Sequence, residues 1–208
     1  MQFLIFDNIL KFRDRIIQQH LLVTLITLIS LLIMASAPES NSILRYQSLE
    51  VSQGEWWRIF TANFCHSNWN HWALNVAGFW MMDIFYSPVL GQKIRAYLML
   101  FCMLFNVLLL DVFLDLTWYV GLSGALHGYL IGGALLSWKT AVKINLAIVL
   151  VVIIKLWFEL QWHINEATET LINANVVEES HAFGAISGGI FFLAVWLTTK
   201  FGNTKSDS

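Results

Sequence analysis

Six apolar stretches, separated by short polar segments, divide the chain along its whole length. Each is close to the about 20 residues that a helix needs to cross the hydrocarbon core of a bilayer, and the second and fourth are the shortest. We therefore expect an all-α membrane protein that forms one domain over residues 1–208. The expected helices are residues 20–37, 71–86, 94–111, 123–138, 144–160 and 181–199.

The composition agrees with a membrane protein. Hydrophobic residues make up 57% of the 208 residues and charged residues only 12%, about half the share usual in a soluble domain. Ten tryptophans suit anchoring at the two membrane interfaces, although core packing could use several of them. The net charge of −2 and the lack of a basic block exclude nucleic acid as an expected partner.

The first apolar stretch has an alternative interpretation. Basic residues precede it, and it ends in Ala35-Ser36-Ala37, which resembles a signal-peptidase site. Pro38 follows directly, and an X-Pro bond is a poor substrate for cleavage. We therefore expect a retained first helix rather than a cleaved leader.

The lysines and arginines predict the orientation, because cytoplasmic loops carry an excess of both. If the chain spans six times, one side holds Lys11, Arg13, Arg15, Lys93, Arg95, Lys139, Lys143, Lys200 and Lys205. The other side has only Arg45 and Arg58 and most of the acidic residues. Both termini are therefore expected to be cytoplasmic.

Four polar side chains share one depth in this topology, because the second, fourth and sixth helices all begin at the outer face. These side chains are His71, Asn75 one turn deeper, Ser123 and His181. Residues four apart lie on one face of a helix, so His71 and Asn75 point the same way. Polar groups inside a bilayer are costly and usually line a site or a water-filled cavity.

Glycines at regular spacing explain how two of these helices could meet. Gly124, Gly128 and Gly132 follow Ser123 at four-residue spacing, and Gly184 and Gly188 continue the face of His181. Small residues at this spacing let helix backbones approach closely in lipid. A serine nucleophile and a histidine base need that approach, because their atoms must come within about 2.6–3.2 Å.

The chemistry this predicts is acyl transfer. Ser123 is the candidate nucleophile and His181 the candidate general base. His71, Asn75 and the backbone N–H of Ser123 are candidate donors to an oxyanion. Taken singly, the glycines fit simple helix packing, the serine a bond to its own helix, and the histidines a solvated interface. Their coincidence at one depth favours a site.

The residues also resemble a known family, the rhomboid intramembrane serine proteases. The resemblance is carried by GLSG at residues 121–124, by His181-x-x-Gly184-x-x-x-Gly188, and by the pattern His66-x-x-x-x-His71-x-x-x-Asn75. The segment Glu55-Trp56-Trp57-Arg58 is similar to the Trp-Arg element of the family's first outer loop.

This resemblance implies a six-transmembrane-helix rhomboid fold with a Ser123–His181 dyad, no cofactor and no metal. The family has no third catalytic acid, and the sequence shows none. His71 and Asn75 align with the oxyanion residues. Glu55, Trp57 and Arg58 would have a structural role in the loop. The fifth helix, with Trp157 and Phe158 near its outer end, would be a lateral gate.

One position departs from many rhomboids, which carry a tyrosine four residues after the serine. Here it is His127, expected to support the dyad by packing on the ring of His181, or else to satisfy a helix backbone group. The short chain, GEWWR and GLSGALHG look most like rhombosortases. That bacterial subfamily is thought to process proteins with a C-terminal GlyGly-CTERM anchor, made of a Gly-Gly motif, an apolar helix and basic residues.

The expected partners are therefore the lipid bilayer and membrane-anchored proteins with a C-terminal transmembrane segment. The expected location is the bacterial inner membrane, with the active site near the periplasmic face. A general rhomboid protease with other substrates, a non-catalytic client-binding relative and a small transporter are the alternatives. Cys65 and Cys102 lie at different expected depths, which argues against a disulfide. Cys65 beside His66 lacks the usual ligand spacing of a zinc site.

Overall fold

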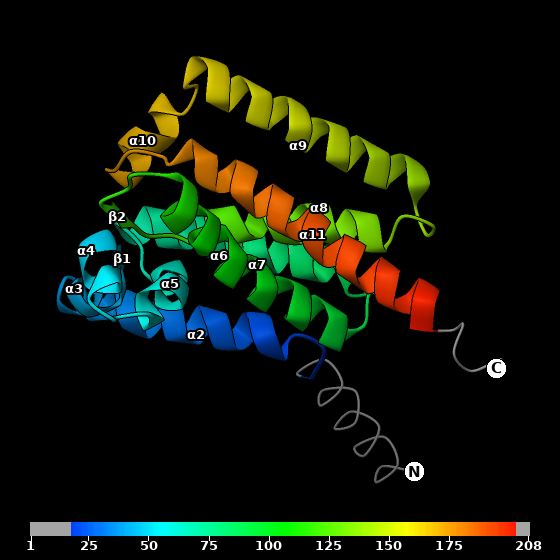
Figure 1. Cartoon of the computed structure of the whole chain (residues 1–208), viewed down its shortest axis with the longest axis horizontal. Helices are drawn as coiled ribbons and strands as arrows, with labels where there is room; N and C mark the ends of the chain where they lie inside the picture. The colour runs from blue at the N-terminus through cyan, green and yellow to red at the C-terminus, as the bar shows by residue number, and fades with distance from the viewer. Residues whose placement is uncertain (1–17, 203–208) are drawn as a thin grey trace, which may run out of the picture.

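The computed structural model describes residues 18–202, and long helices dominate it (Figure 1). Six long helices run back and forth along one axis, and α8 contacts α6, α7, α9 and α11. Their bounds are α2 Leu21–Ala35, α6 Trp69–Tyr86, α7 Gln92–Phe113, α8 Ser123–Leu136, α9 Val142–Trp162 and α11 Glu178–Gly202. This central place of α8 puts Ser123 at the end of the innermost helix.

The expected helices are present with shifted ends. The first is shorter than predicted by one residue at its start and two at its end, and the fourth ends two residues early, at Leu136. The others extend beyond the predicted bounds, most of all α11, which begins three residues before His181. The extensions include polar residues, such as Glu178 and Glu179, that an apolar pattern does not count.

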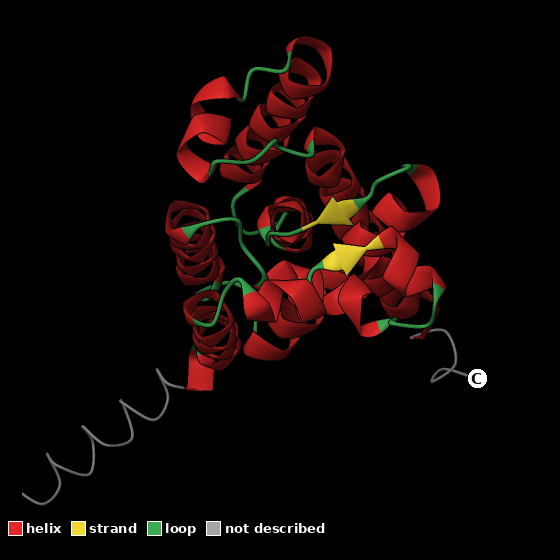
Figure 2. Cartoon of the chain, turned by 90° about the vertical axis from the view of Figure 1, so that its left-hand side faces the viewer, coloured by secondary structure: helices red, strands yellow, loops and turns green. Residues whose placement is uncertain are grey.

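Short elements gather at one end of the bundle, on the left in Figure 1 and facing the viewer in Figure 2. Two strands of two residues each pair antiparallel, with Tyr46 opposite Tyr119 and Gln47 opposite Trp118. An all-α prediction omits this pair, because two-residue strands have no detectable alternation. The short elements are α3 Glu39–Leu44, β1 Tyr46–Gln47, α4 Ser48–Ser52, α5 Trp57–Thr61, η1 Ala62–Phe64, β2 Trp118–Tyr119 and α10 Glu166–Ile172.

Helix α2 packs into the bundle as a structural helix. Val23 and Ile26 are buried in the hydrophobic core. Trp72 and Trp80 of α6 donate their indole N–H groups to Ser30 Oγ and Thr27 Oγ1 at 3.0 and 3.1 Å. These contacts join α2 to α6, and retention of the first apolar stretch stays a prediction.

Helices α8 and α11 touch through their backbones. A Cβ atom added at Gly184 would lie 1.7 Å from the carbonyl oxygen of Gly124, and one at Gly188 would lie 2.1 Å from that of Gly128. No side chain other than hydrogen fits at such a distance. The glycine spacing therefore brings these two helices as close as the sequence predicted.

A buried ionic network holds the opposite end of the bundle. Asp83 of α6 accepts hydrogen bonds from Arg95 of α7 and from the Tyr129 hydroxyl, the latter at 2.9 Å. Its second oxygen lies 2.6 Å from His20 Nδ1. Arg95, expected to be a cytoplasmic loop charge, is thus an internal link between α6 and α7.

Two of the described helices are long enough and apolar enough to cross a membrane. These are α7, with a mean hydropathy of 2.2, and α11, with 1.7. Six membrane crossings therefore stay a prediction. The cytoplasmic placement of both termini also stays one, and Lys11, Arg13, Arg15 and Lys205, on which it partly depends, lie outside the described residues.

Candidate active site

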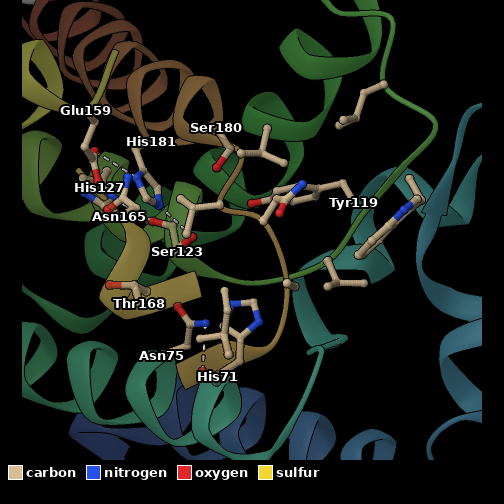
Figure 3. A pocket seen from close by; sticks show the side chains of 18 of the residues that line it. His71, Asn75, Tyr119, Ser123, His127, Glu159, Asn165, Thr168, Ser180 and His181 are labelled. Atoms are coloured by element: carbon tan, nitrogen blue, oxygen red, sulfur yellow. Dashed lines mark hydrogen bonds and ion pairs between the residues drawn. The ribbon is translucent and has the colours of Figure 1, made fainter. Parts of the chain in front are cut away.

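A cavity of about 470 Å³ opens at the end of the bundle that carries the short elements (Figure 3). Its walls come from α6, α8, α9 and α11, from α10, and from the segments before α8 and before α11. All five polar residues predicted for the site line it: His71, Asn75, Ser123, His127 and His181. Three helices thus deliver these side chains to one space.

Ser123 is the first residue of α8, directly after a turn that only glycine fits. Gly121 has φ +117°, and a Cβ atom there would lie 2.8 Å from Cε1 and Nε2 of His71. Both facts require a residue without a side chain. The turn therefore starts α8 close to the His71 ring. It places Ser123 at the helix N-terminus, where backbone N–H groups lack intrahelical partners.

Ser123 and His181 lie within hydrogen-bonding distance. The Oγ of Ser123 is 3.1 Å from Nε2 of His181. His181 stands near the start of α11, is 7% exposed, and faces α8 across the glycine contact. This distance allows the histidine to accept the serine proton.

His71 and Asn75 occupy the α6 side of the cavity. Nδ1 of His71 lies 3.4 Å from the backbone nitrogen of Ser67 and 3.0 Å from its hydroxyl oxygen, and these two contacts do not fix the tautomer of the ring. In the tautomer that carries its proton on Nε2, His71 can donate a hydrogen bond from that nitrogen. Asn75 uses one amide proton on the carbonyl of His71 at 3.1 Å, which leaves its other proton available.

His127 lies against His181, one turn along α8 from Ser123. The two rings are stacked, with centroids 4.2 Å apart and an angle of 22° between their planes. Nδ1 of His127 also lies 2.8 Å from the carbonyl oxygen of Ser123, to which it can only donate. Ring packing and a bond to a helix carbonyl, set against each other in the sequence analysis, thus occur together.

The structure adds an acidic residue that the sequence analysis did not expect. Glu159 of α9 is 1% exposed, and its Oε2 lies 3.1 Å from Nδ1 of His181. Its Oε1 lies 2.6 Å from Nζ of Lys155, one turn earlier in α9. The sequence does contain a sign of this contact. Lys155 and Glu159 lie four residues apart inside an apolar stretch, where charged residues are unusual unless they have partners.

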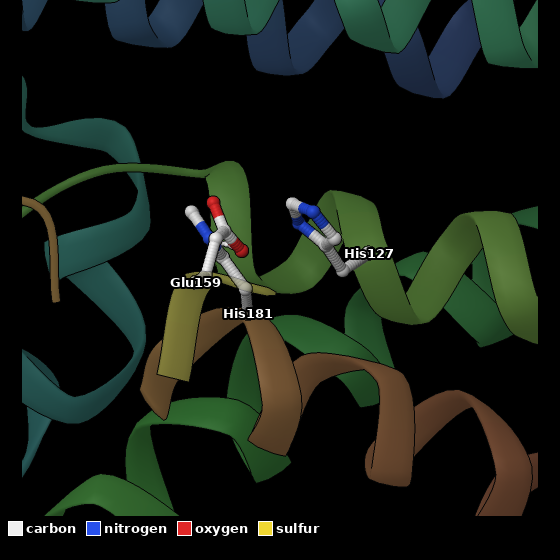
Figure 4. A group of neighbouring side chains, drawn as sticks. All are labelled: His127, Glu159 and His181. Carbon is white, nitrogen blue, oxygen red and sulfur yellow. Dashed lines mark hydrogen bonds and ion pairs between the residues drawn. The ribbon is translucent and has the colours of Figure 1, made fainter. Parts of the chain in front are cut away.

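The same three residues, His127, Glu159 and His181, form the one group among residues 18–202 with metal-ligand spacing (Figure 4). Imidazole binds a metal through a lone pair in the plane of its ring. Two nearly parallel rings 4.2 Å apart do not direct their lone pairs at one point. The geometry therefore fits ring packing better than a metal centre.

Arg58 braces the loop that precedes α6. Its Nη1 donates to the carbonyl oxygens of Ser42 and Arg45 at 3.0 and 2.9 Å, and its Nε donates to Glu55 at 2.6 Å. Trp57 donates its indole N–H to the carbonyl of Ile43 at 3.2 Å. None of these residues lines the cavity, so their contacts fit a structural role.

Helix α10 lies at the mouth of the cavity and is tied to the start of α6. The carbonyl oxygens of Leu171 and Ile172 accept hydrogen bonds from Asn68, Asn70 and Ser67. Ile172 also lines the cavity. These hydrogen bonds therefore hold α10 against the start of α6 beside the cavity.

Cys65 and His66 lie in the loop behind His71, and both are buried. Burial raises the pKa of the Cys65 thiol to about 12, and burial with the nearby His71 lowers the pKa of His66 to about 3. His66 therefore stays neutral, and its ring packs edge-on against His71 at 5.0 Å. Cys65 and Cys102 are both free thiols.

The fold and the cavity define a helical membrane protein with a serine and a histidine paired at the end of two closely packed helices. The family model of the Rhomboid domain matches residues 53–198, about two thirds of the chain. The protein belongs to the rhomboid family, which typically comprises intramembrane serine proteases. Comparison with curated proteins and with solved structures finds no match.

Proposed function

We propose that this rhomboid is an active serine endopeptidase that cleaves membrane-anchored proteins. The observation that carries the proposal is the distance of 3.1 Å between Ser123 Oγ and His181 Nε2, at a cavity in a chain of this family. Relatives that only bind clients usually lack the serine or the histidine, and this chain has both. A small transporter would be expected to have an inverted repeat, and the sequence contains none.

The proposed chemistry uses the groups that line the cavity. Ser123 Oγ attacks the carbonyl carbon of the scissile bond while His181 Nε2 takes its proton. The negative oxygen accepts hydrogen bonds from His71 Nε2, the amide of Asn75 and the N–H of Ser123. His181 then protonates the leaving amine, and the acyl-enzyme passes its acyl group to water or to another nucleophile.

The proposed substrates carry a C-terminal GlyGly-CTERM anchor, which would make the enzyme a rhombosortase of the bacterial inner membrane. The segments GEWWR and GLSGALHG support this narrower assignment. The active site would lie near the periplasmic face. Helix α9 would admit the substrate from the lipid, and the exposure of Trp157 and Phe158 near its outer end suits a surface that meets lipid or a substrate helix.

Labelling by a fluorophosphonate probe tests the catalytic claim without knowledge of the substrate. We expect wild-type protein in detergent to be labelled, and Ser123→Ala not to be. Ser187→Ala is a matched control, because Ser187 is buried in α11 and its hydroxyl only bonds the carbonyl of Phe183 in its own helix. Folded wild-type protein without Ser123-dependent labelling by fluorophosphonate or isocoumarin probes would contradict the proposal.

A second experiment tests the substrate class. The protein is co-expressed with a reporter that ends in a Gly-Gly motif, an apolar helix and basic residues, and the new C-terminus is identified by mass spectrometry. We expect cleavage near the Gly-Gly motif that depends on Ser123. Cleavage only of membrane proteins without such an anchor would leave a general rhomboid protease.

A further inference from the structure

Glu159 contacts the ring nitrogen of His181 that faces away from Ser123, and a mechanism with Ser123 and His181 alone gives it no role. Glu159 is almost completely buried, although it belongs to helix α9, which presents mostly apolar side chains to its surroundings. A buried carboxylate is costly unless its oxygens have partners. Both oxygens of Glu159 have one: Oε1 faces Lys155 Nζ at 2.6 Å, and Oε2 faces His181 Nδ1 at 3.1 Å.

The positions of the protons follow from these contacts. An ionised carboxylate paired with a lysine ammonium group can only accept hydrogen bonds, so Nδ1 of His181 must carry the proton that it shares with Glu159. In the neutral ring, Nε2 is then unprotonated and directs its lone pair at Ser123 Oγ, 3.1 Å away. This is the tautomer that a general base needs.

We propose that Glu159 is a positioning residue that completes a Ser123–His181–Glu159 arrangement by holding His181 in the tautomer and ring orientation required of the base. The proposal rests on the proposed serine peptidase function. When the proton of Ser123 moves to Nε2, His181 becomes an imidazolium with a proton on each nitrogen. Glu159 keeps its negative charge, stabilises that cation through Nδ1–H, and takes no proton itself.

The other groups around His181 leave this role to Glu159. His127, on the α8 side, stacks on the ring face and bonds the carbonyl of Ser123 through Nδ1, so it contacts neither nitrogen of His181 by a hydrogen bond. Lys155 reaches His181 only through Glu159. Among residues 18–202, Glu159 therefore provides the one acidic contact to Nδ1.

The competing explanation is that Glu159 exists only to pair with Lys155. An i,i+4 lysine–glutamate pair on a helix surface is common, and it stabilises by only a few tenths of a kcal/mol. It does not require a buried carboxylate, and the Lys155 side chain is 41% exposed. If this pair were the whole role, Lys155→Gln and Glu159→Gln would have similar effects.

Kinetics of purified variants test the proposal on the membrane substrate for which wild-type cleavage is found. We expect Glu159→Gln to lower kcat by ~10²–10⁴-fold, the range over which a neutral replacement of such a carboxylate disturbs the tautomer, with KM within about threefold. Glu159→Asp keeps the charge and should recover part of the loss. Lys155→Gln leaves the carboxylate in place and should lose less than about tenfold.

A spectroscopic readout separates positioning from a loss of structure. Selective ¹⁵N labelling of histidine should show His181 protonated at Nδ1 in the wild type at neutral pH, and a loss of this preference in Glu159→Gln at an unchanged melting temperature. His181→Ala provides the assignment.

The outcomes separate this inference from the proposed function. If Glu159→Gln turns over within about threefold of the wild type while Ser123→Ala is inactive, the peptidase stands and the positioning role of Glu159 is wrong. Equal losses in Lys155→Gln and Glu159→Gln, with an unchanged His181 tautomer, would also overturn it. If the wild type shows no labelling and no cleavage that depend on Ser123, both the proposed peptidase function and the role of Glu159 are overturned.

Discussion

The contact of α8 with α11 and the contact of α9 with the bundle differ in kind. Helices α8 and α11 meet backbone to backbone, so tightly that a Cβ atom at Gly184 would overlap the carbonyl of Gly124. Helix α9 buries only Asn145, Val152 and Glu159 along 21 residues. The Ser123–His181 pair therefore lies across a backbone-to-backbone contact, and Glu159 behind it comes from a helix that buries only a few side chains.

This difference suggests a division of labour within the site. Packing fixes the distance between Ser123 and His181, whether or not α9 moves. The contact of Glu159 with His181 exists only while α9 is docked. If α9 moves to admit a substrate, as proposed, the site is complete only after the helix returns.

The largest effect is expected from a side chain in the α8–α11 contact. Gly184→Val places methyl groups where the Gly124 carbonyl lies and must separate the two helices. A displacement of 1 Å at a catalytic pair costs on the order of 100-fold in rate. We expect at least that loss in kcat/KM, together with a lower melting temperature.

Gly189→Ala is the matched control for this variant, because Gly189 lies on the same helix and a Cβ atom there meets nothing within 4 Å. We expect it to retain wild-type rates and stability. Equal activity of Gly184→Val and Gly189→Ala would show that the close contact is not what sets the dyad geometry.

The next effect concerns α6, which lies outside both contacts and carries His71 and Asn75, two of the proposed oxyanion donors. His71→Ala or Asn75→Ala should lower kcat by about 10- to 1,000-fold, since a single oxyanion donor is worth ~10²–10³. The measurement is kcat and KM for each single variant and for the double variant. Rates within twofold of the wild type in all three would remove His71 and Asn75 from the mechanism.

A smaller effect is expected at His127, which extends the α8–α11 contact by stacking on His181. The loss of an aromatic pair costs about 1 kcal/mol, so His127→Ala should reduce kcat by roughly fivefold. His127→Tyr and His127→Phe keep a ring at this position and should retain most of the activity. If these two variants are as impaired as His127→Ala, the role of His127 is a specific imidazole function and not ring packing.

The smallest effect on chemistry is expected at Arg58, which lies outside the cavity. Arg58→Ala removes a buried guanidinium that donates to two backbone carbonyls and to the partly exposed Glu55, and leaving buried acceptors without their donor costs about 1–3 kcal/mol. We expect a clearly lower melting temperature and, at a temperature where the variant is folded, kcat/KM within about tenfold of the wild type. An unchanged melting temperature with complete loss of activity would instead indicate contact with the substrate.

The sequence predicted the parts of the fold and site that depend on periodicity. The apolar stretches and the glycine spacing indicated six helices and the approach of α8 to α11. The shared depth of His71, Ser123 and His181 indicated a common cavity. These features depend on helix geometry, which the sequence expresses directly.

Other features depend on tertiary contacts that the sequence does not express. Glu159 is 22 residues from His181, and only the packing of α9 against α11 brings them together. The strand pair of Tyr46 with Tyr119 joins segments 73 residues apart and is too short to leave a pattern. The sequence alone makes Arg95 a loop charge. Its buried partner Asp83 lies on another helix, and no sequence pattern shows that the two side chains meet.

The central claim is that Ser123 and His181 act as one catalytic unit. Its most direct test is the turnover of one membrane-anchored substrate by reconstituted wild type, Ser123→Ala, His181→Ala and the double variant. Groups that act as a unit lose no more together than singly. We therefore predict that all three variants are equally inactive while remaining folded. Normal turnover by either folded single variant, or a double variant clearly slower than both, would contradict the account.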